Sequence, residues 1–204
     1  MKVISKFKQW LAINIYRKYK LIEANALNTI NDNLLKKFSS IGKNCFFQYQ
    51  DFFISGFQYI YIGDNFSVGR CFRMEAIDEY ASNHFSPQIV IGDNVRIEDY
   101  CHIGCIDKVT IGNGVLIASK VFISDHNHGN VSKDDIDVPP TKRPLSSKQV
   151  HIGDNVWIGD NVTILPGVTL GNNVIVGANA VVTHSFPANS VIAGCPAQII
   201  KTLN

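Results

Sequence analysis

Aliphatic residues recur at every sixth position through the last part of the chain, and this period restricts the possible folds more than any other feature. The recurring residues are Ile152, Ile158, Ile164, Leu170, Val176 and Val182. Four positions after each of the first five stands another small or β-branched residue: Val156, Val162, Val168, Val174 and Ala180. A strand alternates its faces every two residues, so an even period keeps the same position of every copy facing inward. The pattern predicts short strands wound into stacked coils, and its unbroken length argues against an ordinary β-sandwich.

The same period extends upstream with one change of phase. The upstream copies begin at Ile91, Ile97 and Ile103 and, after a two-residue insertion, at Ile111, Ile117 and Ile123, with weaker ones at Ile41 and Ile62. Gly-Asp-Asn and Gly-Asn-Asn triplets follow many of the aliphatic positions, and these residues tolerate the positive φ of a sharp corner. We therefore expect an all-β domain of stacked coils over residues 41–201.

The bulk composition is that of one ordinary globular domain. The chain has 204 residues, 46% of them hydrophobic, and its 19 lysines and arginines barely exceed its 17 aspartates and glutamates. So small an excess of positive charge argues against a nucleic-acid partner, and the sequence has no run of about 18 apolar residues to span a membrane. The five cysteines form no C-x-x-C pair, which is typical of reduced thiols in a cytoplasmic protein rather than of a disulfide or zinc framework. We expect no bound metal.

Residues 1–40 lack the six-residue period, and we interpret them as a helical segment. Basic residues (Lys2, Lys6, Lys8, Arg17, Lys18, Lys20) interleave with apolar ones (Val3, Ile4, Phe7, Trp10, Leu11, Ile15, Tyr19), largely at helical spacing. In the favoured interpretation, the segment packs against the coils or against a second subunit. In the other, a basic amphipathic helix associates weakly with the anionic inner face of a membrane.

The period fails between residues 126 and about 150. This stretch, HNHGNVSKDDIDVPPTKRPLSSKQ, is polar and charged and contains three prolines. We expect it to leave the stack of coils as an inserted loop. A loop of this length inside a compact domain is usually functional.

Four segments carry a resemblance to a known family. They are LIASKVFISDHNHG, the inserted loop that follows it, VHIGDNVWIGDNVTILPGVTLG and VIAGCPAQIIK. Over residues 60–201 the chain resembles the hexapeptide-repeat acyltransferases, most of all the sugar O-acetyltransferases of the maltose/galactoside type and those that modify O-antigen or other surface polysaccharides. The resemblance implies a left-handed parallel β-helix, an exception to the usual right-handed crossover. It also implies a homotrimer with sites between subunits, and direct transfer of acetyl from acetyl-CoA to a hydroxyl of a sugar or oligosaccharide acceptor.

Two histidines stand at the start of the inserted loop. An alcohol attacks a thioester well only when a base removes its proton, and histidine, with a pKa near 6.5, suits that role. The resemblance implies that the base is His128, five residues after the inward Ile123. His126 would then bind the acceptor or orient the base, and Asp125 would fix the tautomer of one ring. The alternative is that both histidines merely belong to an exposed loop.

The resemblance also implies a set of donor-binding residues. Trp157 would lie near the thioester, small residues would let the pantetheine arm approach the coils, and the last two residues of the set would contact the nucleotide end of CoA. The set is Trp157, Gly159, Gly177, Ala178, Thr183 and Lys201. The alternative for Trp157 is an outward aromatic that covers one face of the coils.

The acceptor residues depart from the family pattern. Where galactoside-type enzymes carry a sugar-binding asparagine, this chain has Glu98, followed by Asp99 and Tyr100. A carboxylate can still accept hydrogen bonds from hydroxyls, so we expect these three residues to bind the acceptor. Arg73, Glu75 and Asp78 are weaker candidates for the same groove.

Three other functions remain open. One is N-acetylation of an amino-sugar nucleotide. Another is a zinc-dependent enzyme of the carbonic anhydrase type, for which His102, His126, His128 and His151 are the available ligands, although the spacing of His126 and His128 does not match that family. The last is a scaffold without activity, which would not bind CoA.

Overall fold

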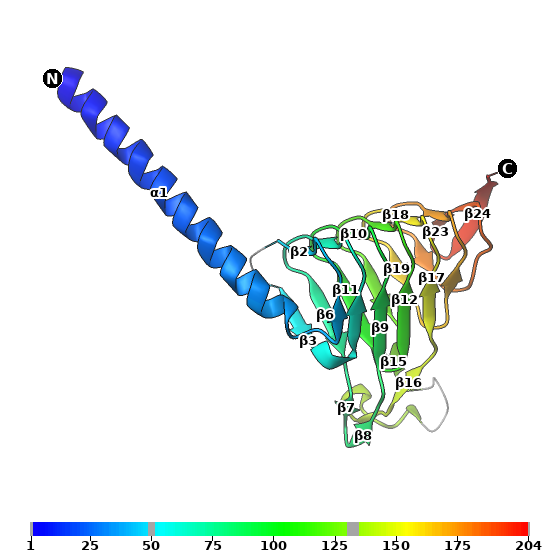
Figure 1. Cartoon of the computed structure of the whole chain (residues 1–204). Helices are drawn as coiled ribbons and strands as arrows, with labels where there is room; N and C mark the ends of the chain where they lie inside the picture. The colour runs from blue at the N-terminus through cyan, green and yellow to red at the C-terminus, as the bar shows by residue number, and fades with distance from the viewer. Residues whose placement is uncertain (1, 49–51, 130–134, 204) are drawn as a thin grey trace. The chain divides into compact units, whose positions relative to one another are not determined.

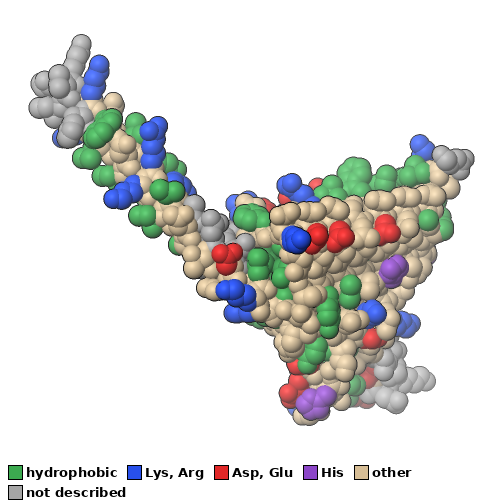
Figure 2. Space-filling model, viewed as in Figure 1, with side chains coloured by type: hydrophobic (Ala, Val, Ile, Leu, Met, Phe, Trp, Pro, Cys, Tyr) green, Lys and Arg blue, Asp and Glu red, His purple; other side chains and the backbone are tan. Residues whose placement is uncertain are grey.

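The computed structural model describes residues 2–48, 52–129 and 135–203, and the chain forms two compact units, residues 1–37 and 38–204. The first unit is one long helix, α1 (Lys2–Leu35). Among the residues singled out in its sequence, the side chains of Lys2, Val3, Ile4 and Phe7 lie outside the description, as do residues 130–134 of the expected inserted loop. Figure 2 shows hydrophobic and basic side chains mixed on the visible face of α1. Within the described residues, no helix is long and apolar enough to cross a membrane.

The second unit is a parallel β-helix whose coils each place one short strand in each of three sheets (Figure 1). Sheet A contains β1 (Ser40–Ile41), β4 (Ile60–Ile62), β9 (Gln88–Ile91), β12 (Lys108–Ile111), β17 (Val150–Ile152) and β20 (Thr169–Leu170). Sheet B contains β2 (Phe46–Phe47), β5 (Ser67–Val68), β10 (Arg96–Ile97), β13 (Leu116–Ile117), β18 (Trp157–Ile158), β21 (Ile175–Val176), β23 (Ser190–Gly194) and the antiparallel β24 (Ala197–Thr202). Sheet C contains β3 (Phe53–Ser55), β6 (Arg73–Ala76), β11 (His102–Cys105), β14 (Phe122–Ser124), β19 (Thr163–Ile164) and β22 (Val181–Val182).

The aliphatic positions of the period form the core. In sheet B, Ile97, Ile117, Ile158 and Val176 stand in register on consecutive strands, and none is more than 1% exposed. The inward column predicted from the six-residue spacing is therefore present. In the first coils, phenylalanines occupy many of the inward positions, among them the fully buried Phe47, Phe66 and Phe72, which explains why the repeat is weak there.

The corner triplets have two roles. Their asparagines adopt the left-handed backbone conformation, as at Asn94 (φ 57°) and Asn155 (φ 55°). The residue before each of these asparagines also links neighbouring coils: the side chain of Asp154 accepts the backbone N–H of Asn113 at 2.7 Å, and the side chain of Asp93 accepts that of Asp64 at 2.7 Å. Each such bond satisfies a backbone donor at the turn, where no strand partner is available.

Two antiparallel hairpins leave the coils between sheet C and sheet A. The first pairs β7 (Glu79–Tyr80) with β8 (Asn83–His84), and the sequence did not predict it. The second lies at the base of the inserted segment and pairs β15 (His126–His128) with β16 (Leu145–Ser147). The chain rejoins sheet A at β17. Figure 1 shows both hairpins projecting from the same side of the β-helix.

Candidate active site

A cavity of about 770 Å³ lies over the outer face of sheet C. Strands β3, β6, β11 and β14 form its floor, and the two hairpins contribute Tyr80 on one side and His126 and His128 on the other. The cavity therefore lies where the six-residue period is interrupted, as expected for a functional loop. All of its lining residues belong to the second unit.

His126 forms an ion-pair-like contact with a fully buried carboxylate. Its Nδ1 lies 2.9 Å from Oδ1 of Asp125, and the Ser124 hydroxyl is 3.3 Å from the same nitrogen. The His126 side chain is 14% exposed, whereas Asp125 is 0% exposed. An imidazole whose Nδ1 faces a carboxylate carries its proton there, which leaves Nε2 as the proton acceptor.

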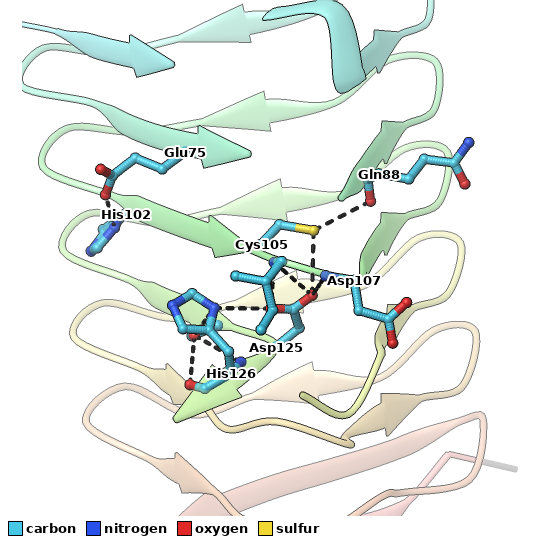
Figure 3. Close-up of polar contacts among 9 residues, drawn as sticks. Glu75, Gln88, His102, Cys105, Asp107, Asp125 and His126 are labelled. Atoms are coloured by element: carbon cyan, nitrogen blue, oxygen red, sulfur yellow. Dashed lines mark hydrogen bonds and ion pairs between the residues drawn. The ribbon is translucent and has the colours of Figure 1, made fainter. Parts of the chain in front are cut away.

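Asp125 is held by several donors from the neighbouring coil (Figure 3). The backbone N–H groups of Ile106 and Asp107 donate to it at 3.0 and 2.8 Å, and the Cys105 thiol donates at 3.3 Å. Burial alone would raise the pKa of Asp125, but the hydrogen bonds from His126, Asp107, Ile106 and Cys105 outweigh it and lower that pKa. Burial, and then the Asp125 charge, raise the pKa of the Cys105 thiol, so it stays protonated and serves as a donor.

His128 has a different environment. Its Nδ1 lies 3.3 Å from the Tyr80 hydroxyl, and the two rings pack edge to face with centroids 5.3 Å apart. The same hydroxyl donates to the backbone oxygen of Thr141 at 3.1 Å. Tyr80 therefore links the first hairpin to the inserted segment, and no carboxylate in the described part of the chain contacts His128.

A second imidazole–carboxylate pair lies on the cavity floor (Figure 3). Nε2 of His102 is 3.1 Å from Oε2 of Glu75, which also accepts a short hydrogen bond from Nε of Arg73. Burial, and then the Arg73 charge, lower the pKa of His102, so the ring is neutral near pH 7. Burial opposes ionisation of Glu75, but Arg73 and then His102 outweigh it and lower the pKa of that carboxyl. Of this cluster, sequence reasoning proposed Arg73 and Glu75 for the acceptor groove but considered His102 only as a zinc ligand.

The sequence and the fold match known proteins. The family model described as bacterial transferase hexapeptide (six repeats) matches residues 149–184. WbbJ of Escherichia coli (strain K12), whose name assigns it to lipopolysaccharide biosynthesis as an O-acetyl transferase, is 46% identical over 149 residues, 71% of this chain and 72% of WbbJ. The chain belongs to the hexapeptide-repeat acyltransferases.

Solved structures agree with this assignment. A maltose O-acetyltransferase of Clostridium difficile 630 has 29% identity and a TM-score of 0.54, with 85% of this chain and 74% of that chain covered. A galactoside acetyltransferase in complex with coenzyme A has 27% identity and a TM-score of 0.50, with 85% and 70% covered. AntD, an N-acyltransferase of Bacillus cereus, has a TM-score of 0.69 and coverage of 85% and 89% but only 21% identity, so it supports the fold alone. The predicted left-handed parallel β-helix is confirmed, and the protein is an acyltransferase.

The expected acceptor residues of this acyltransferase lie away from the cavity. Glu98 pairs with Arg96 at 2.6 Å, and Asp99 pairs with Arg70 at 2.8 Å while also accepting the Arg70 backbone N–H. Tyr100 occupies a corner with φ 63°. These residues follow β10, at the corner between sheets B and C, and a single chain does not bring them to His126.

The expected donor residues of the acyltransferase are also outside the cavity. Trp157, on β18, is 51% exposed, and Thr183 and Lys201 are exposed. A Cβ at Gly159 would lie 2.8 Å from the backbone nitrogen of Ala178, and one at Gly177 would lie 3.0 Å from Cβ of Ala193. Close packing of neighbouring coils therefore accounts for both glycines without a ligand.

The structure does not assemble the four histidines considered for zinc. His151 lies on sheet A, where its Nδ1 is 2.6 Å from the Thr110 hydroxyl, whereas His126 and His128 lie on β15. Within residues 2–48, 52–129 and 135–203, no group of three or more His, Cys, Asp or Glu side chains could hold a metal ion.

Proposed function

We propose that the protein transfers an acetyl group from acetyl-CoA to a hydroxyl of a sugar or surface-polysaccharide unit, with His126 as the general base. The observation that carries this proposal is the Asp125–His126 pair at the cavity wall, with Nδ1 of the ring 2.9 Å from a fully buried carboxylate. The name of WbbJ and the coenzyme A in the galactoside acetyltransferase structure support the acyl donor and the class of acceptor.

The chemistry needs one proton relay. Nε2 of His126 takes the proton of the acceptor hydroxyl while the oxygen attacks the thioester carbonyl. The ring becomes a cation, which the Asp125 carboxylate stabilises. The tetrahedral intermediate collapses by breaking the carbon–sulfur bond, and the CoA thiolate takes the proton from His126. A backbone N–H at the coil edge would stabilise the oxyanion.

We propose His126 rather than His128 because, among the residues that the structure describes, His126 has a buried anionic partner and His128 has none. The resemblance alone favoured His128, since that residue stands five positions after Ile123. The hydroxyl of Tyr80 beside His128 cannot stabilise an imidazolium as a carboxylate does. His128 would instead contact the acceptor from the wall of the cavity.

The donor, the acceptor residues and the assembly complete the proposal. Two subunits of a homotrimer would form each site, so that one subunit's Trp157, Gly159, Gly177, Ala178, Thr183 and Lys201 bind acetyl-CoA beside the partner's cavity. Glu98, Asp99 and Tyr100 lie near the same corner as Gly159 and would reach an acceptor bound between subunits. The enzyme would act in the cytoplasm, where α1 would pack against a second subunit or, in the alternative, attach weakly to the membrane surface through its basic residues.

The test is release of CoA thiol from acetyl-CoA in the presence of methyl glycosides, oligosaccharides and amino sugars, with mass spectrometry of the products. We expect thiol release that depends on a hydroxyl sugar and yields an alkali-labile ester. Products acetylated only on nitrogen would instead support the amino-sugar reaction. Stoichiometric zinc in protein that releases no thiol would support the carbonic anhydrase type, and failure to bind CoA would support a scaffold.

A further inference from the structure

The Glu75–His102 pair has two polar atoms that no described residue pairs with. Both contacts of Glu75 go to Oε2, and the contact of His102 goes through Nε2. Among the residues that the structure describes, neither Oε1 of Glu75 nor Nδ1 of His102 has a hydrogen-bond partner. The Glu75 side chain is 14% exposed and that of His102 is 30% exposed, and both line the cavity. The oxygens of a largely buried carboxylate are normally paired, so Oε1 of Glu75, with Nδ1 of His102 beside it, is available to a ligand in the cavity.

The pair lies close to His126. Gly104, on β11, separates the two rings: a Cβ built at this position would be 3.1 Å from Cε1 of His126 and 3.8 Å from Nε2 of His102. These two ring atoms are therefore within about 7 Å of one another. Because the rings are neighbours, two oxygens on adjacent carbons of one ligand can bridge the gap between them by hydrogen bonds of about 2.8 Å each. The missing side chain of Gly104 leaves that gap open.

The chemistry of the pair selects its ligand. A neutral His102 that donates from Nε2 to Glu75 has an acceptor at Nδ1, and Oε1 of Glu75 is a second acceptor. Two acceptors, one of them anionic, attract an O–H donor and repel a carboxylate or a phosphate. The guanidinium of Arg73, held 5.8 Å from the centre of the Phe53 ring, can donate to the oxygen of the same hydroxyl.

We propose that Glu75 and His102 bind the hydroxyl next to the one that is acetylated, so that the enzyme requires an acceptor with two neutral hydroxyls on adjacent carbons. This inference rests on the proposed function, because it assumes that His126 activates the acceptor hydroxyl. His102 is then a specificity-determining residue. It discriminates by hydrogen bonding, which separates substrates more strongly than the shape of an apolar pocket does.

The test compares methyl α-pyranosides (glucoside, galactoside, mannoside and rhamnoside) with analogues that lack the hydroxyl beside the acetylated one. The variants are His102→Phe, which keeps an aromatic ring against Phe122, and Glu75→Gln, which keeps the shape of the side chain. Thr163→Val is the matched control, since Thr163 stands in register with Phe122 on the same face of sheet C. Thiol release gives kcat/KM for both substrates, and saturation-transfer NMR measures pyranoside binding directly.

We expect wild-type enzyme and Thr163→Val to prefer the parent pyranoside by roughly 10- to 100-fold over its deoxy analogue. His102→Phe and Glu75→Gln should lose about that factor on the parent only, with KM for acetyl-CoA nearly unchanged. Retained discrimination in both variants would overturn the inference, as would an equal loss on parent and analogue. Wild-type enzyme that neither acetylates nor binds any of the pyranosides would overturn the proposed acceptor class as well.

Discussion

Asp125 connects the core of the β-helix to the proposed base. It accepts two backbone N–H groups and a thiol from the adjacent coil while it orients His126. The order of the sequence places these two residues side by side, but it does not reveal that the aspartate is buried. A residue of this kind should affect both catalysis and stability when it is replaced.

We predict that Asp125→Asn lowers kcat/KM for the acceptor by roughly 10²- to 10⁴-fold, because the amide no longer holds the proton on Nδ1 or stabilises the imidazolium. KM for acetyl-CoA should change little. The control is Asp107→Asn, which keeps the backbone N–H that Asp125 accepts and alters a side chain bonded to Gln149. An Asp125→Asn enzyme with normal turnover would contradict the role of the pair.

The lowered pKa of Asp125 also predicts how stability depends on pH. A carboxyl whose pKa is lower in the folded than in the unfolded state stabilises the fold above its unfolded pKa of about 3.9. This contribution is lost as the pH falls through the lower, folded pKa. The free energy of unfolding of wild-type protein should therefore decrease below about pH 4. In Asp125→Asn the decrease should be smaller. Urea titrations at several pH values measure the free energy of unfolding, and an equal decrease with falling pH in the two proteins would contradict this prediction.

The choice between His126 and His128 could not be made from sequence. The two residues are two positions apart on one strand, so their side chains lie on the same side of the hairpin. Only the three-dimensional environment distinguishes them, because His128 contacts Tyr80 of the other hairpin whereas His126 contacts the buried Asp125. The pairing of His102 with Glu75 could not be predicted from sequence either, since the two residues lie on different coils.

The regular and irregular elements differ in how far sequence predicts them. The coils follow from local rules that repeat every six residues, and the inserted segment was visible as a break in those rules. The β7–β8 hairpin carries no such signal, because its turn places Ala81 (φ 47°) and Ser82 (φ 64°) in the left-handed region. Two-residue hairpin turns of this geometry usually contain asparagine and glycine.

Contact between the two hairpins gives a prediction for Tyr80. Tyr80→Phe removes the hydroxyl that contacts His128 and donates to Thr141, at a cost of about 1 kcal/mol. We expect KM for the acceptor to rise roughly fivefold and protease cleavage within residues 126–150 to become faster. Tyr61→Phe, on sheet A, is the control and should change neither quantity. Unchanged acceptor KM and unchanged cleavage would show that the hairpins do not support one another.

The proposed homotrimer would use the outer face of sheet B. Leu116, Trp157 and Ile175 stand in register on consecutive strands, and the first two are 39% and 51% exposed. An outward apolar row on adjacent strands is typical of a surface that another molecule covers. It supports the proposed homotrimer, and it leaves both interpretations of Trp157 open, as a donor-binding residue and as an aromatic cover.

Leu116→Glu tests the trimer. A charge in this row should convert trimers to monomers, because burying an unpaired carboxylate costs several kcal/mol, and light scattering after gel filtration would measure the mass. Thr169→Glu, exposed on sheet A, should leave the mass unchanged. Trp157→Ala separates the two interpretations of that residue, since a donor contact would raise KM for acetyl-CoA without dissociating the trimer. Leu116→Glu protein that keeps the mass of a trimer would contradict an interface on this row.

The most direct test of the central claim is acceptor-dependent kcat/KM for His126→Ala beside His128→Ala, measured by thiol release with the same acetylated acceptor. If His126 is the base, His126→Ala loses roughly 10²- to 10⁴-fold while His128→Ala loses about tenfold or less through weaker acceptor binding. Circular dichroism should show that both variants remain folded. A folded His126→Ala enzyme with near-normal turnover, beside an inactive His128→Ala enzyme, would contradict the account.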